Sequence, residues 1–347
     1  MTEVGLIKLP RKPNDRPKIE DVAKLSGLSI TTVSMVLNNR PNTRLSPEAR
    51  SRVLESATAL NYRPNIAAKS LKTSKTQMIG FVSDEVATTR FASGLIRGAL
   101  NETLISKYVM LVMETQGDYS IEEETFAALL DRQVNHVIVA SMRAREIKLP
   151  PISANMRVVM LNATNILYPL TVLPDELTGG QTVVTALMKR GSNQRIALIG
   201  KNRRVEESIY DSITIPRRMM GIKEKLKNYG LEIEIEIETD QWDPADGFVA
   251  TQKLLKMNKN ISSIICMNDR LAFGAYQALT AAGKRIPEDI SIVSFDNDSI
   301  ASYMKPGLTT VALPHEEMGA QAVKLLLGNA SAETVLVPMP LIERESV

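Results

Sequence analysis

The residues best suited to chemistry lie on a short predicted helix near the N-terminus, residues 30–37. Val33, Val36 and Leu37 form an apolar side that would pack inward. The opposite side carries side chains short enough to approach base edges and thymine methyl groups, namely Ile30, Thr31, Ser34 and Met35. A face of this kind is suited to reading the major groove of DNA.

The neighbouring segments predict elements that would present this helix. A helix is expected over residues 19–26, and Gly27 supplies a sharp turn after it. Ser29 is placed to cap the second helix, and Ser46-Pro47 opens a third, with proline at the first helical position. Three short helices with this turn indicate a helix-turn-helix unit, although a plain three-helix bundle would show the same pattern.

The charge distribution agrees with a DNA-binding segment. Residues 1–75 hold 14 Lys/Arg and 6 Asp/Glu, whereas the rest of the chain holds 28 and 33. A small basic segment on a larger acidic body favours a polyanion-binding arm, although a solvated basic surface would look alike by charge alone. We expect residues 1–17, with three prolines and no apolar period, to form a flexible basic arm.

From residue 78 onward, short apolar runs alternate with helical segments. The expected strands are residues 78–83, 108–113, 136–140, 157–161, 195–199, 263–267 and 291–295. Residues 232–238 alternate strictly and predict a half-exposed edge strand. Ser120 is expected to open a helix with a capping box. Buried runs with helices between them indicate doubly wound parallel sheets, and about 270 residues suffice for two such units.

Several classes of protein are excluded by composition and motif. The chain has 347 residues, 44% hydrophobic and 23% charged, without the ~18 consecutive apolar residues of a membrane span or the apolar core of a signal peptide. One cysteine (Cys266) and two histidines (His136 and His315) argue against a metal site. We find no hydrolase elbow, Walker loop or dinucleotide motif, so we expect no catalytic residues and no cofactor. The expected location is the cytoplasm.

Several motifs in order carry a family resemblance. Residues 19–29, 32–34 and 36–38, and then 60–65 and 67–71, resemble the lactose-repressor/galactose-repressor transcription factors, and the resemblance extends from about Lys18 to the C-terminus. It implies a helix-turn-helix domain at 18–63, a hinge helix or linker at 64–75, and an effector-binding and dimerisation core at 76–347.

The resemblance also implies which residues meet double-stranded operator DNA. They are Ser29, Ile30, Thr31, Thr32, Ser34, Met35, Asn38, Tyr62, Asn65, Lys69 and Leu71. Leu71 would be the hinge leucine that wedges between base steps in the minor groove. Met35 departs from the family, which often has arginine there. Since methionine cannot make the bidentate contact of arginine to guanine, we expect a different operator.

For the core, the resemblance implies two lobes of the periplasmic-binding-protein type, joined by three crossings near Asp175, Thr309 and Ser331. Lobe 1 would comprise about 76–174 and 310–330, and lobe 2 about 175–309 and 331–347. The effector would lie in the cleft, near Phe91, Asn162, Arg218, Trp242, Asn268 and Asp296. Asn268 could equally be a helix N-cap, and Leu313 stands where some members carry a polar contact.

These residues suit a neutral molecule with many hydroxyl groups, so the first expectation is a sugar, with disaccharides included. The chain would then be a repressor of a carbohydrate operon. We expect a homodimer and not a tetramer, because no C-terminal leucine heptad follows the core. The alternatives are a regulator that responds to a purine or a phosphorylated sugar and, more remotely, a solute-binding protein without a regulatory role.

Overall fold

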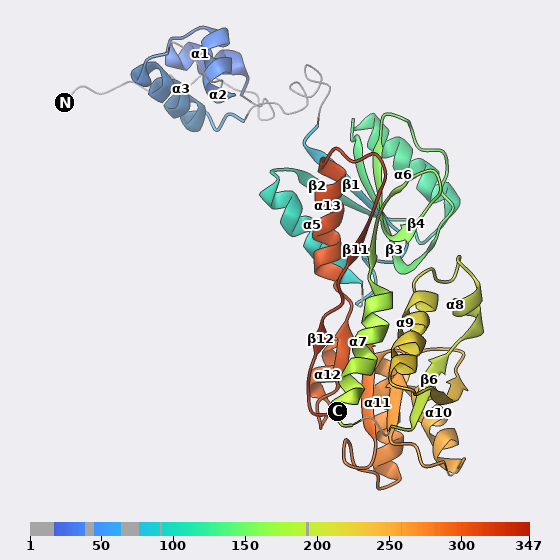
Figure 1. The fold of residues 1–347 in the computed structure, drawn as a ribbon. Helices are drawn as coiled ribbons and strands as arrows, with labels where there is room; N and C mark the ends of the chain where they lie inside the picture. The colour runs from blue at the N-terminus through green and yellow to red at the C-terminus, as the bar shows by residue number, and fades with distance from the viewer. Residues whose placement is uncertain (1–16, 39–44, 64–75, 91, 192–193, 258) are drawn as a thin grey trace, which may run out of the picture. The chain divides into compact units, whose positions relative to one another are not determined.

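A computed structural model describes residues 17–38, 45–63, 76–90, 92–191, 194–257 and 259–347. The chain divides into two compact units, Met1–Ser74 and Lys75–Val347. The described elements of the smaller unit are all helices, whereas the larger unit combines helices and strands. Figure 1 shows the elements of both units.

The smaller unit contains the predicted helix-turn-helix. Its helices are α1 (Ile19–Ser26), α2 (Ile30–Leu37) and α3 (Pro47–Ala59). Gly27 ends α1 in the left-handed conformation, with φ at 67°. The Ser29 hydroxyl accepts a hydrogen bond from the Thr32 amide, and the Ser46 hydroxyl accepts one from the Ala49 amide. The expected limits and caps of α2 and the start of α3 are therefore confirmed.

A small apolar core holds the three helices together. It is built from Val22 and Ala23 of α1, Val33 and Val36 of α2, and Val53 and Ala57 of α3. Because each helix contributes residues to this cluster, the opposite side of α2 remains exposed.

The larger unit has two lobes, and the first is built on a six-stranded parallel sheet (Figure 1). The strand order is β11-β5-β4-β3-β1-β2. The bounds are β1 (Met78–Ser83), β2 (Val109–Glu114), β3 (His136–Glu146), β4 (Arg157–Thr164), β5 (Leu170–Pro174) and β11 (Glu333–Val337). Helices α5 (Ser93–Ile105) and α13 (His315–Leu327) cover one face, and α6 (Tyr119–Asp131) packs on the other.

The second lobe has a similar six-stranded sheet with the strand order β12-β10-β9-β8-β6-β7, in which β12 pairs antiparallel with β10 and the other pairings are parallel. Its strands are β6 (Ile196–Lys201), β7 (Ile233–Glu238), β8 (Ser263–Cys266), β9 (Ser291–Asp296), β10 (Thr309–Ala312) and β12 (Leu341–Ile342). Its helices are α7 (Glu176–Met188), α8 (Arg203–Glu207), α9 (Ile215–Asn228), α10 (Pro244–Lys256), α11 (Asp269–Ala281) and α12 (Ser299–Tyr303). The alternating segment forms β7 at one edge, as predicted.

Two of the expected crossings between the lobes were placed too early. Thr309 starts β10, which pairs with β9 of the second lobe, so that crossing comes after Ala312. Ser331 precedes β11, which pairs with β5 of the first lobe, so the last crossing comes after Val337. Both strands are short and begin with polar residues, Thr309-Thr310 in β10 and Glu333-Thr334 in β11, which is why the sequence did not reveal them.

One predicted cap was also wrong. Helix α6 begins at Tyr119, and the carboxylate of Asp118 accepts hydrogen bonds from the amides of Ser120 and Ile121. Asp118 therefore takes the capping role expected of Ser120, because the helix begins at Tyr119 and its unpaired first-turn amides include those of Ser120 and Ile121.

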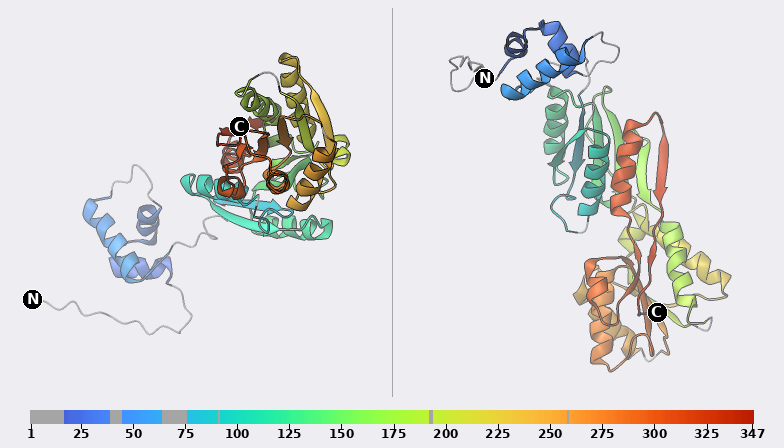
Figure 2. Two further views of the ribbon diagram at one scale, coloured as in Figure 1. Left: turned by 90° about the horizontal axis from the view of Figure 1, so that it is seen from below. Right: turned by 90° about the vertical axis from the view of Figure 1, so that its left-hand side faces the viewer.

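Helices in both lobes pack at backbone contact. In the first lobe, a Cβ atom at Gly98 of α5 would lie 1.7 Å from the carbonyl oxygen of Glu316 in α13. In the second lobe, a Cβ atom at Gly221 of α9 would lie 2.0 Å from the carbonyl oxygen of Leu177 in α7. Figure 2 shows α13, in red, lying along the first lobe beside the cyan helix α5. These close approaches fix where the helix N-termini lie.

Gly98→Ala should therefore destabilise the protein. The added methyl group must push α5 and α13 apart, at a cost of about 1–3 kcal/mol that exceeds the gain in helix propensity. Urea unfolding of the full chain should show this loss. Asn101→Ala, at an exposed position of the same helix, is the control. Equal stability of the two variants would contradict the close contact.

Candidate functional site

The exposed side of α2 presents the residues that the sequence singled out. Ile30 is 47% exposed, and Thr31 is also exposed. Ser34 and Met35 are partly exposed, while Val33 and Val36 are buried beneath them. At the end of the helix, the Asn38 amide nitrogen donates hydrogen bonds to the carbonyl and hydroxyl oxygens of Ser34. This face is a short ridge of apolar and hydroxyl groups.

In the larger unit, the carboxyl ends of the second lobe's strands surround a buried ion pair. Arg218 of α9 and Glu176 of α7 are each 2% exposed, and the guanidinium donates to both carboxylate oxygens at 2.6 and 2.7 Å. A third nitrogen of Arg218 donates to the carbonyl oxygen of Met267 at 2.7 Å. The guanidinium lies 4.0 Å from the ring centre of Phe295.

Three more polar residues lie at this end of the sheet. The Trp242 indole donates to the carbonyl oxygen of Gly200 at 2.9 Å, and its ring packs on the second lobe's core. Asn268 caps α11 through the Leu271 amide, and its side-chain nitrogen donates to the carbonyl oxygen of Trp242. Asn268 therefore has the capping role that the sequence left open.

Asp296 differs from these residues. It ends β9 with φ at 106°, a conformation that favours glycine. No described residue donates a hydrogen bond to its carboxylate. Burial, and then the carboxylate of Asp269, raise the pKa of Asp296 well above its ordinary value, although Arg218 opposes the shift. This carboxylate has the acceptor capacity to bind a further donor.

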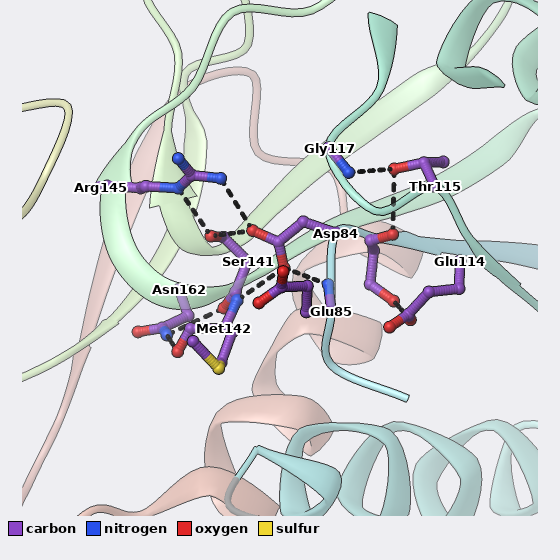
Figure 3. Close-up of polar contacts among 10 residues, drawn as sticks. Asp84, Glu85, Glu114, Thr115, Gly117, Ser141, Met142, Arg145 and Asn162 are labelled. Carbon is purple, nitrogen blue, oxygen red and sulfur yellow. Dashed lines mark hydrogen bonds and ion pairs between the residues drawn. The ribbon is translucent and has the colours of Figure 1, made fainter. Parts of the chain in front are cut away.

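The first lobe carries a matching polar network where its strands end (Figure 3). The Asp84 carboxylate accepts hydrogen bonds from the Ser141 hydroxyl at 2.6 Å, the Met142 amide at 2.9 Å and the Arg145 guanidinium at 3.0 Å. Asn162 is buried with φ at 53°, and its amide nitrogen donates to the carbonyl oxygens of Ser141 and Met142. The network joins the ends of β1, β3 and β4.

Glu122, in the first turn of α6, faces this network. Burial and the carboxylate of Asp84 raise the pKa of Glu122 to about 7, against an opposing effect of Arg145. Asp118 adds a smaller like-charge effect in the same direction. The first lobe therefore also holds a carboxyl group that is poorly compensated by positive charge.

A cavity of about 460 Å³ lies between the two lobes, within the range of small-molecule sites. One wall comes from the start of α5, with Arg90, Ser93, Gly94 and Arg97. Another comes from the segment after β9, residues 296–299, and the third from the crossing at residues 313–317. Asp296 and Leu313 both line it.

Besides the three covalent crossings, an extension of β3 connects the lobes through backbone hydrogen bonds. The Glu146 amide donates to the carbonyl oxygen of Ile209 at 2.8 Å, and the Ile213 amide donates to that of Ala144 at 2.9 Å. Residues 208–213 belong to the second lobe and lead into α9. We call residues 144–146 and 209–213 the interlobe strap.

The described residues give little support for other kinds of site. Among them, no three His, Cys, Asp or Glu side chains are grouped so that they could hold a metal ion. Cys266 is fully buried in β8, and burial raises the pKa of its thiol. Within the same ranges, no helix has the length and apolar character needed to cross a membrane.

Comparison with known proteins agrees with both units. Residues 18–65 match the family described as bacterial regulatory proteins, lacI family, and residues 184–347 match the periplasmic binding protein-like domain. The "Probable HTH-type transcriptional repressor ExuR" of Bacillus subtilis (strain 168) is 30% identical over 347 residues, covering 95% of this chain and 98% of that protein. The chain belongs to the LacI family.

Two further relatives of this LacI-family regulator are informative. The ribose operon repressor of Haemophilus influenzae is 28% identical over 342 residues, covering 95% of this chain and 98% of the relative. The lac repressor dimer, solved bound to operator and the anti-inducer ONPF, is 24% identical and covers 96% of this chain and 99% of its own, with a TM-score of 0.74. The second likeness concerns the fold alone.

The structure brings only some of the expected effector residues to one place. Arg218, Trp242, Asn268 and Asp296 gather at one end of the second sheet, whereas Asn162 lies in the first-lobe network. Of these residues, only Asp296 lines the cavity, whereas Arg218 and Asn268 donate hydrogen bonds to backbone carbonyl oxygens of the protein. Phe91, Asn65, Lys69 and Leu71 lie outside the described residues. Tyr62 is partly buried against the helix-turn-helix core.

Sequence reasoning missed the partners that make the site charged. Glu176 directly follows the first crossing, and Asp84 directly follows β1, a position where parallel sheets often place ligand-binding groups. That position was an available signal for Asp84. No local pattern pairs Glu176 with Arg218, because they lie 42 residues apart.

Arg218→Met should be strongly destabilising in this LacI-family protein. It leaves the Glu176 carboxylate buried without its counterion, which costs about 3–5 kcal/mol. Urea unfolding should show this loss, and the double variant Glu176→Gln/Arg218→Met should regain much of it, since neither member of the pair is then charged. A cost below about 1 kcal/mol for the single variant, measured in the same way, would show that the pair is not structural.

Glu122→Gln should change the pH dependence of stability. The folded-state pKa of about 7 lies above the ordinary value of 4.5, so Glu122 favours folding most at low pH and loses this contribution as pH rises towards 7. The variant should match the wild type near pH 4.5 and exceed it near pH 8 by about 1–2 kcal/mol, after allowance for solvent screening. Glu123→Gln, on the exposed side of α6, should have the same stability as the wild type at both pH values.

Proposed function

We propose that this LacI-family protein is a repressor of a carbohydrate-utilisation operon, and that a sugar bound between its lobes releases it from operator DNA. The observation that carries the proposal is the cavity at the carboxyl ends of the strands, lined by a carboxylate without a donor. The name of the ribose operon repressor supports the sugar class. The protein would work in the cytoplasm, where bacterial DNA lies, and it needs no catalytic group or cofactor.

The exposed face of α2 would read the operator. Ile30, Thr31, Ser34 and Met35 would contact base edges, with Ser29, Thr32, Asn38 and Tyr62 near the backbone and Asn65, Lys69 and Leu71 in the hinge. Met35 offers a flexible apolar side chain, which suits a thymine methyl group better than guanine. Binding should weaken steeply with salt, because phosphate contacts release counterions.

A homodimer would place two reading helices on a near-palindromic site. The first lobe has an apolar surface suited to this role, on α5 and the edge strand β2. Leu104, Ile105 and Val109 are 71%, 73% and 60% exposed. Exposed apolar side chains on neighbouring elements are typical of a protein interface.

Coupling between the two sites would pass through the relative position of the lobes. Effector bound in the cavity contacts both lobes, so it favours one arrangement over another. A change in that arrangement at the dimer interface alters the spacing of the two hinge segments, and a coupling of about 1–3 kcal/mol is typical for such linkage.

The test begins with selection of duplexes from a random pool by the full chain. Ile30→Ala should weaken binding to the selected duplex about 10-fold, since it removes an apolar contact to a base. Leu54→Ala is the matched control, because Leu54 is 49% exposed on α3 and Ile30 is 47% exposed on α2. Equal affinities of the two variants would contradict the assigned reading face.

The effector is then sought by fluorescence of Trp242, the sole tryptophan. A panel of mono- and disaccharides should include one that gives a saturable change and weakens binding to the selected duplex about 5- to 150-fold, the usual range of such coupling. Release by a nucleobase, with no response to any sugar, would replace the sugar proposal by a purine-responsive regulator.

A further inference from the structure

The charges around the cavity distinguish between classes of sugar. Asp296 presents its carboxylate to the cavity without a hydrogen-bond donor from any described residue. Asp296 is partly exposed on the cavity wall, so a donor or a cation on the molecule that fills the cavity can bind its carboxylate directly.

The protein groups behind Asp296 do not supply a hydrogen-bond donor or a free cation for its carboxylate. Arg218 is the cation that lowers the pKa of Asp296, but its guanidinium already donates hydrogen bonds to Glu176 and to the carbonyl oxygen of Met267. Asp269 accepts hydrogen bonds from the Ser294 hydroxyl and the Asp298 amide. The carboxylates of Glu176, Asp269 and Asp298 all oppose ionisation of Asp296, so negative charge is in excess on this wall.

The opposite wall has a different character. Helix α5 begins without a side-chain cap, so the amides of its first turn, at Ser93 and Gly94, are donors that can meet ligand oxygens. Arg97 is paired with Glu316 at 3.0 Å. Arg90, which is exposed, adds one cation at the rim. Hydroxyl oxygens suit this wall, and a donor suits the wall of Asp296.

We propose that the effector is an amino sugar or amino polyol, with its ammonium group against Asp296 and its hydroxyl oxygens towards the start of α5. This rests on the proposed function, since it names the chemistry of the sugar that would fill the same cavity. An ammonium group has three donors and a full positive charge, which stabilises the ionised form of Asp296 beside the carboxylate of Asp269. A neutral sugar brings no such charge, and an acidic sugar adds a further negative charge.

The experiment compares matched sugars that differ in one substituent. Glucosamine, glucose and glucuronate form one series, and galactosamine, galactose and galacturonate form another. Calorimetric titration of the full chain at pH 7 should show, in at least one series, the amine binding about 10-fold or more tightly than the neutral sugar, an advantage of about 1.4 kcal/mol. In that series the acidic sugar should bind more weakly than both.

Asp296→Asn is the informative variant, because asparagine tolerates positive φ and keeps the size of the side chain. It should reduce the preference for the amine to within about 3-fold while leaving the neutral sugar bound, because only the charge is lost. Glu288→Gln, the control, changes an exposed carboxylate of the second lobe that does not line the cavity. It should keep most of the preference.

Proton release gives an independent readout. If Asp296 is protonated in the empty cavity, binding of the ammonium group should expel that proton, and the measured heat should then depend on the ionisation enthalpy of the buffer. Glucose should show no such dependence.

Three outcomes are decisive. Tighter binding of a neutral or acidic sugar in every series that binds would overturn the inference and leave the sugar-responsive repressor intact. An amine preference that survives Asp296→Asn would overturn the role of Asp296. Absence of binding by every sugar at millimolar concentration would contradict both the inference and the sugar class on which it rests.

Discussion

The carboxyl-end side of the second lobe's sheet depends on one buried guanidinium. Arg218 joins the start of α7, the end of β8 and the body of α9, and it stacks on Phe295 of β9. A buried ion pair adds little net stability over an apolar pair, but it tolerates very few arrangements of its neighbours. The pair therefore fixes the geometry around it. Asp296, the residue after Phe295, is held at a strained φ in a position that an unconstrained chain would not favour.

Much of this architecture could be predicted from local signals. Ser29 and Ser46 marked helix starts through orphan amides, and strict alternation marked β7 as an edge strand. Local signals failed where a short segment depends on distant partners. Strand β10 contains only Thr309–Ala312, and it is a strand because β9 lies beside it. Similarly, the sequence predicted a cap at Ser120 although Asp118 caps α6, because two residues that can both cap a helix lie close together here.

The candidate site was predicted less completely than the fold, and the reason is electrostatic. Residue types and family motifs pointed to Arg218, Trp242, Asn268 and Asp296, and these residues do gather at the carboxyl ends of the second lobe's strands. Their roles depend on which groups are already engaged, and that requires Glu176 and Asp269, which no motif marked. Only the pattern of filled and unfilled hydrogen bonds distinguishes Asp296, whose carboxylate lacks a donor among the described residues, from Asn268, which caps a helix.

The interlobe strap has a consequence for how the two lobes can move apart. Three covalent crossings can bend gradually as the lobes move, whereas the hydrogen bonds from Glu146 to Ile209 and from Ile213 to Ala144 must either hold or break. Separation of the lobes at this side therefore requires that both hydrogen bonds break. Because the strap leads directly into α9, which carries Arg218, breaking these two bonds would release the segment that precedes the helix of the buried ion pair.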